Sequence, residues 1–198
     1  MSGARRDLTA DAAREKLLAP ATIFCDPDAR LVDRTVASGD LGRAISRALV
    51  KHSLWIGEVV RERGGLRVLA THLSEALEYE GGEDHAPVLR DAMLLLAALG
   101  GLESTGKEPN APQGGVRFAD RRSAAAVRRE LRELGVADVV IKLLDAADPH
   151  VRFHAHVAAQ NLSADAGVAI ALLRPAALAA IERAAAHADP ATRPAPDG

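Results

Sequence analysis

The chain has 198 residues, which is enough for one domain with a sizeable hydrophobic core. Hydrophobic residues make up 48% and charged residues 26%, but aromatic residues reach only 3%. The 25 basic residues nearly balance the 27 acidic ones, so no global field favours binding to nucleic acid or to acidic membranes. Because the abundant residues include the strong helix formers alanine, leucine, arginine and glutamate, we expect an all-α fold.

Cysteine content and hydropathy indicate the cellular compartment in which the protein is expected. The single cysteine, Cys25, cannot form an internal disulfide, which favours a reducing environment. No apolar run approaches the ~20 residues of a membrane span, and the N-terminus lacks the hydrophobic region of a signal peptide. These features predict a soluble cytoplasmic protein with no membrane span.

The first 39 residues combine one helical signal with an irregular stretch. Residues 10–18 read as a short helix, with Thr9 as its cap and Pro20 as its end. Residues 21–39 contain a proline, several aspartates and no sustained helical period, which predicts at most a short turn of helix. We therefore expect a capping helix and an irregular extension over 1–39.

A helical pattern follows over residues 40–64, with a break expected near Gly57. A second helix is predicted over 66–77, followed by an acidic, glycine-containing loop at 78–84. The next helix, from Pro87 to Gly100, is apolar on most sides, so we expect it to be buried between neighbours.

The C-terminal half begins with a loop and continues as helix. Residues 103–120 are rich in glycine and proline and predict a flexible loop. Residues 121–188 complete a repeat domain that spans 40–188, and 189–198 read as a disordered tail. Interruptions within the helical segment are expected at Gly135, at Asp148-Pro149 and at 163–167.

The chain contains an internal repeat. Residues 130–152 align without a gap on 171–193, at an offset of roughly 40 residues, the length typical of helical solenoid repeats. A further copy starts at Arg61. Matched pairs include Leu131 with Leu172, Val140 with Ile181, Asp148 with Asp189, and Pro149 with Pro190.

The sequence pattern of each repeat unit predicts a short helix, a tight turn, a second helix and a longer third helix. Gly64 and Gly135 fall at the turn, where positive φ would strain other residues. Asp148 before Pro149 is a helix-start signal. Because no unit can bury its apolar face alone, neighbouring units are expected to stack.

The segment 131–165 resembles an armadillo repeat along its whole length. The resemblance implies a short right-handed α-solenoid whose third helices line a concave groove for extended peptides or protein segments. It also implies that Asn161 clamps the ligand backbone. The pattern departs from the nuclear-import type at Val157, where a tryptophan is typical, and at Ala98, which replaces the asparagine in the upstream copy. Basic nuclear-import peptides are therefore not the expected ligand.

The expected partner-binding site lies on the third helix of this unit. Asn161, Val157 and His154 fall at spacings that place them on one helix face. Arg152 and Gln160 flank them. The alternative for Asn161 is a purely structural role at the end of its helix.

Three other groups of residues are weaker candidates. His150, His154 and His156 lack further ligands at metal-binding spacing, so we expect solvated or groove-lining histidines. The acids within 25–33 lack the spacing of a calcium loop, and no nucleotide-binding or nucleophile motif occurs. We expect no cofactor and no metal. A basic run is interleaved with Glu130 and Glu133, which favours an exposed, salt-bridged face; its members are Arg121, Arg122, Arg128, Arg129 and Arg132.

Together these patterns predict a non-catalytic protein–protein interaction module, acting as a scaffold or as a subunit of a larger assembly. The C-terminal copy lacks a third helix and should expose the preceding apolar face, which would be covered by a partner or by self-association. One alternative is a small α-helical enzyme or regulatory domain that uses His72, His85 or the C-terminal histidines. Another is a compact helical bundle that serves as an adaptor.

Overall fold

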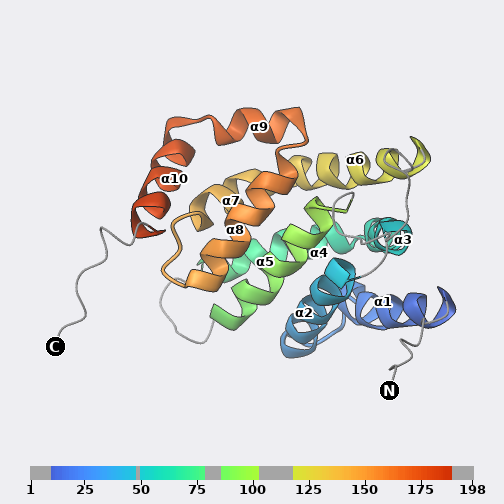
Figure 1. The fold of residues 1–198 in the computed structure, drawn as a ribbon. Coiled ribbons are helices and arrows are strands. Elements are labelled where there is room, and N and C mark those ends of the chain that lie inside the picture. Colours follow the sequence, from blue (N-terminus) through green and yellow to red (C-terminus); the bar gives the residue numbers. More distant parts are fainter. Residues whose placement is uncertain (1–9, 48–49, 79–85, 103–117, 189–198) are drawn as a thin grey trace, which may run out of the picture.

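The computed structural model describes residues 10–47, 50–78, 86–102 and 118–188. Within these residues all regular secondary structure is helical, which confirms the all-α expectation. None of these helices combines the length and the apolar character needed to cross a membrane. In chain order (Figure 1) they are α1 (Ala10–Cys25), α2 (Leu31–Arg47), α3 (Val50–Glu62), α4 (Gly65–Glu78), α5 (Ala86–Gly100), α6 (Phe118–Glu133), α7 (Val136–Leu143), α8 (Pro149–Leu162), α9 (Ala166–Leu172) and α10 (Pro175–Ala188).

Three helices that are far apart in the sequence, α2, α5 and α8, lie side by side (Figure 1). The middle one, α5, packs against α2 on one flank and α8 on the other. Its side chains are completely buried at Ala92, Met93, Leu95, Leu96 and Leu99. This confirms that the apolar helix expected from Pro87 lies between neighbours.

The helices of residues 50–102 contact their counterparts in residues 118–162. α3 packs on α6, α4 on α7 and α5 on α8. At the N-terminal end α1 packs against α2, α3 and α4, and at the C-terminal end α10 packs against α7 and α9. The helices of these two segments therefore pack directly on one another.

Close contact between α2 and α5 depends on Gly42. A Cβ at this position would lie 2.9 Å from Cγ of Leu94 and 3.1 Å from Cα of Leu95. Since the Leu95 contact involves backbone, a side chain at position 42 would force the two helices apart.

The two turns that precede α4 and α7 each contain a glycine in the backbone conformation expected from the sequence. Gly64 precedes α4 with a φ of 74°, and Gly135 precedes α7 with a φ of 77°. Both lie in the left-handed region that favours glycine. The predicted role of these two glycines is confirmed.

The expectation of irregular structure over 21–39 is wrong. α1 continues through Pro20 to Cys25, and α2 begins at Leu31. Proline lacks an N–H and weakens a helix interior, but the residues after it, Ala21 and Phe24, are completely buried. Burial of this apolar surface offsets the missing hydrogen bond.

The break expected near Gly57 is not found there, because Gly57 lies inside α3. A Cβ at Gly57 would come 2.5 Å from Cδ1 of Leu102. Gly57 therefore makes room for a core side chain. In addition, α6 begins at Phe118, inside the segment expected as loop.

Several expectations concern residues outside the described part of the chain. These are Thr9 as a cap, the loops at 79–85 and 103–117, His85, the side chains of Arg121 and Arg122, and the segment 189–198 with Asp189 and Pro190.

Candidate functional site

The predicted start of α8 is confirmed. The Asp148 side chain is the helix cap: its Oδ1 accepts hydrogen bonds from the backbone N–H groups of His150 at 2.8 Å and Val151 at 3.0 Å. Pro149 occupies the first turn, where its missing N–H has no cost. Local chemistry therefore fixes where α8 begins.

The same carboxylate links α8 to α5. Nε of Arg90 donates to Oδ2 of Asp148 at 2.8 Å, and the Arg90 terminal nitrogen contacts the same oxygen. The hydrogen bond from Arg90 is the largest cause that lowers the pKa of Asp148 to about 2. One side chain thus couples the start of α8 to its packing partner.

Asn161 ties the other end of α8 to α5. Its Nδ2 donates to the carbonyl oxygen of Ala97 at 2.9 Å, and that oxygen also accepts from the Gly101 N–H at 3.1 Å. A Cβ at Gly100 would lie 3.3 Å from Cβ of Asn161, so the helices cross closely here. One Nδ2–H of Asn161 therefore already donates to the backbone of α5. A peptide clamp would depend on the second Nδ2–H and on the side-chain carbonyl oxygen.

The remaining residues of the predicted partner-binding site lie along α8. His154 and Val157 are half-buried on the row that ends in Asn161, and Gln160 is exposed. The Arg152 guanidinium points back and donates to a carbonyl of the turn before α8 at 2.8 Å. Partner binding by these five residues stays a prediction.

Charged side chains connect α2 and α5. Arg43 of α2 lies 3.0 Å from Asp40 and 3.5 Å from Asp91 of α5. Burial is the main cause that raises the pKa of Asp91, while Arg43 opposes the shift. Burial likewise lowers the pKa of His154 on α8, and the Asp91 charge opposes that change. Arg43 thus joins α2 to α5, and the main influence on the pKa of His154 is its own burial.

Sequence reasoning did not find Arg43 or Asp91, because their contact depends on how α2 crosses α5. The available signal was the pair Gly39 and Gly42, three residues apart across the boundary between the expected irregular stretch and the helical pattern that follows. Small residues at this spacing mark a helix face that a neighbour approaches closely. The residues beside that face are then candidates for cross-helix contacts.

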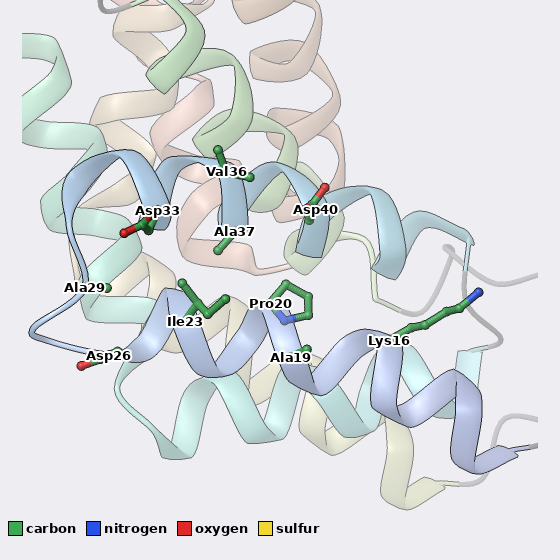
Figure 2. A pocket seen from close by; sticks show the side chains of 10 residues that line it. All are labelled: Lys16, Ala19, Pro20, Ile23, Asp26, Ala29, Asp33, Val36, Ala37 and Asp40. Carbon is green, nitrogen blue, oxygen red and sulfur yellow. The ribbon is translucent and has the colours of Figure 1, made fainter.

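A groove of about 640 Å³ lies between α1 and α2 (Figure 2). Pro20 and Ile23 of α1 point toward α2, and Lys16 lies at one end. Ile23 is 46% exposed and Val36 is 54% exposed, which is high for aliphatic side chains in a cleft. The lining consists of Lys16, Ala19, Pro20, Ile23, Asp26, Ala29, Asp33, Val36, Ala37 and Asp40.

The candidate metal-binding and catalytic residues are considered next, over the described part of the chain. No group of three or more histidine, cysteine, aspartate or glutamate side chains there could hold a metal ion. His72 on α4 is 2% exposed, and its Nε2 has no hydrogen-bond partner. Burial, followed by the charge of Arg34, lowers the pKa of His72. Burial also raises the pKa of the Cys25 thiol, which favours its protonated form.

The acidic segment after Cys25 is a turn between helices. Oδ1 of Asp26 accepts from the Asp28 N–H at 2.9 Å, and Arg34 donates to the Asp26 carbonyl at 3.1 Å. Asp33 pairs with Arg30 at 2.6 Å. These contacts stabilise the turn within the chain.

Over the residues whose side chains are described, the basic run of α6 is only in part the exposed, salt-bridged face expected from the sequence. Arg128 is buried, and its Nη1 donates to the carbonyl of Gly100 at 3.4 Å. Arg132 lies 3.5 Å from both Glu133 and Asp165. These arginines make contacts within the fold.

Comparisons of the chain with protein families, with curated proteins and with solved structures find no match in any of the three.

Proposed function

We propose that this chain is a non-catalytic interaction module that binds a protein or an extended peptide across α2, α5 and α8. The observation that carries the proposal is that α2, α5 and α8 lie side by side, with the Arg43–Asp91 ion pair joining α2 to α5 and the Arg90–Asp148 pair joining α5 to the start of α8. Three helices side by side offer a continuous surface to a segment that crosses them.

The proposed architecture is a short, right-handed, armadillo-like α-solenoid. Its support is the pairwise contact of α3 with α6, α4 with α7 and α5 with α8. A shift by one repeat unit would produce this pattern. The left-handed glycines at 64 and 135 add a second feature shared by the two units.

The chemistry of the face suits an extended backbone. Such a segment presents N–H groups and carbonyls without partners. Asp91 can accept hydrogen bonds, Arg43 can donate them, and Val157 can supply apolar contact. A module of this kind would serve as a scaffold or as a subunit of a larger assembly.

The test uses the full chain and a displayed library of random peptides as the probe. Peptides selected on the wild type are measured against Val157→Arg, which places a long cation on the proposed face. The matched control is Ala125→Arg, at an exposed position on α6, whose neighbours are α3, α4, α5 and α7. We expect the dissociation constant to rise at least about tenfold for Val157→Arg and to change little for the control.

Two results would contradict the proposal. One is that no peptide is selected by a folded wild-type chain. The other is that the selected peptides bind Val157→Arg as tightly as the wild type.

A further inference from the structure

Three matched positions of the repeat are buried in two units and exposed in the third. The alignment of Arg61 on Arg132, and of residues 130–152 on 171–193, sets the register of α4, α7 and α10. The side chains are buried at Leu66, Leu69 and Leu73 and at Ala137, Val140 and Leu144, but they are exposed at Leu178, Ile181 and Ala185. The exposed residues of α10 therefore stand where the other two units have core residues.

The helix that follows differs between the units. α4 is followed by α5 and packs against it, and α7 packs against α8 in the same way. Among the described residues no helix follows α10, which packs against α7 and α9. Leu178 is 44% exposed and Ile181 is 37% exposed. The third unit thus has no third helix in the described part of the chain, and its matched apolar side chains are open.

The flank of α8 away from α5 has the register of a second contact with such a helix. Ala92 of α5 is aligned on Ala155 of α8, and in that register Arg90 matches Phe153. Arg90 faces the next third helix, because its Nε donates to Oδ2 of Asp148 at the start of α8. Phe153 is 62% exposed, and α10 lies on the side of α8 away from α5 (Figure 1). Phe153 and the open face of α10 therefore border the place of a further third helix.

The sequence of residues 189–198 does not match that of a third helix. Pro194 and Pro196 stand at the positions aligned with Phe153 and Ala155, and a proline inside a helix removes a hydrogen bond and clashes with the preceding turn. The segment also contains no leucine, isoleucine, valine, methionine or aromatic residue. It lacks the side chains that would cover an apolar face.

We propose that α10 and the open flank of α8 bind an amphipathic α-helix of a partner protein, which takes the place of a third helix in the third unit. The length to match is that of α5 and α8, which have 15 and 14 residues. Apolar residues at helical spacing on the partner pack against Leu178, Ile181 and Phe153, as ridges pack into grooves between ordinary helices. The proposal goes beyond the extended peptide of the proposed function and uses other side chains, so either can hold without the other.

The probe is a displayed library of 15-residue peptides built on an alanine-rich helix and randomised on one face. Peptides selected on the full wild-type chain are measured by calorimetry against Leu178→Glu and Phe153→Glu. The matched control is Val32→Glu, which places the same charge at an exposed apolar residue of α2. We expect the dissociation constant to rise at least about tenfold for the first two variants and to change less than about twofold for the control.

A second comparison tests that the bound peptide is helical. A proline at the centre of a selected peptide interrupts its helix and should weaken binding at least about tenfold. Circular dichroism of each variant alone checks the fold, which should tolerate changes at exposed positions. Ile181→Glu replaces a variant that fails to fold.

Four results would overturn the proposal. A folded wild type selects no helical peptide, or the selected peptides bind Leu178→Glu or Phe153→Glu as tightly as the wild type. The proline-containing peptide binds unchanged, which would show recognition of an extended segment. In sedimentation equilibrium without peptide, a wild-type dimer that Leu178→Glu dissociates would assign the surface to a second copy. Loss of the extended-peptide site would instead appear as insensitivity to Val157→Arg, so the two proposals fail separately.

Discussion

The crossing of α5 and α8 buries apolar side chains, whereas the hairpin of α1 and α2 leaves some of its apolar side chains exposed. α5 buries its apolar side chains against helices on both flanks, and polar bonds from Arg90 to Asp148 and from Asn161 to α5 hold the crossing at both ends. The α1–α2 hairpin buries one side only and leaves Ile23 and Val36 exposed. Substitutions in the middle should therefore change stability, whereas substitutions at the exposed side chains of the hairpin should change it little.

The largest effect is expected at the closest crossing in the middle. Gly42→Leu would place a side chain against the backbone of Leu95, and overpacking of this kind should lower the free energy of unfolding by about 3 kcal/mol. Arg47→Leu, exposed in the same helix, should change it by less than about 0.5 kcal/mol. Urea denaturation of both variants measures the difference. Equal stability of the two variants would show that α2 and α5 do not cross closely at Gly42.

The second largest effect concerns the start of α8. Asp148→Ala removes the cap and the contact with Arg90, and should lower the free energy of unfolding by about 2 kcal/mol. Asp148→Asn keeps a capping side chain and loses only the charge, so it should lose less. If both substitutions cost the same, the cap contributes nothing measurable beyond the pair with Arg90.

The charge of Asp148 also sets a pH dependence. Its folded pKa of about 2 lies below the unfolded value of about 3.9. The ionised carboxylate therefore stabilises the fold above about pH 4, and this contribution is lost as the pH falls through about 2. Thermal melts should show the advantage of the wild type over Asp148→Asn shrinking in that window. A constant difference down to pH 2 would contradict the pair with Arg90.

A smaller effect is expected at the far end of the same crossing. Asn161→Ala removes the hydrogen bond to Ala97 and should lower the free energy of unfolding by about 1 kcal/mol. Gln160→Ala, at the exposed neighbour, is the matched control and should be close to neutral. An unchanged melting temperature for Asn161→Ala would show that the hydrogen bond to Ala97 contributes nothing measurable to stability.

The effect of His72 should appear only in acid. Because its folded pKa is lowered from about 6.5, the unfolded chain takes up the proton more readily, and stability falls as the pH drops below that value. His72→Leu should reduce this loss, while His154→Gln controls for the other histidine with a lowered pKa. Melting curves from pH 7 to pH 5 compare the slopes. A wild type and a His72→Leu variant with the same slope would contradict a buried neutral histidine.

The smallest effect on stability is expected at Val36, an exposed residue of α2. Val36→Glu should change the free energy of unfolding by less than about 0.5 kcal/mol, because the side chain is already exposed. Denaturation measures this. A loss of stability comparable to that of Gly42→Leu would show that the side chain at position 36 is packed within the fold.

Elements with local chemistry could be predicted from the sequence. The Asp148–Pro149 helix start and the turns at Gly64 and Gly135 depend on a few neighbouring residues, and the structure confirms them. The bond from Asn161 to Ala97 could not be predicted, because it spans 64 residues and depends on a helix crossing.

The α1–α2 hairpin was missed for a different physical reason. Proline usually ends a helix, so Pro20 was taken as the end of the first one. In α2, the buried face includes Ala37, Ser38 and Gly39, which carry little of the apolar period that identifies a helix in a sequence. Tertiary burial overrides both local signals.

Chemical-shift mapping by NMR tests the central claim, binding across three helices, most directly. The full chain, labelled with ¹⁵N, would be titrated with a peptide selected on the wild type. We expect the shifted amides to gather on α2, α5 and α8, around Arg43, Asp91 and Val157. Shifts confined to α6 and α7, or to the α1–α2 groove alone, would contradict the claim.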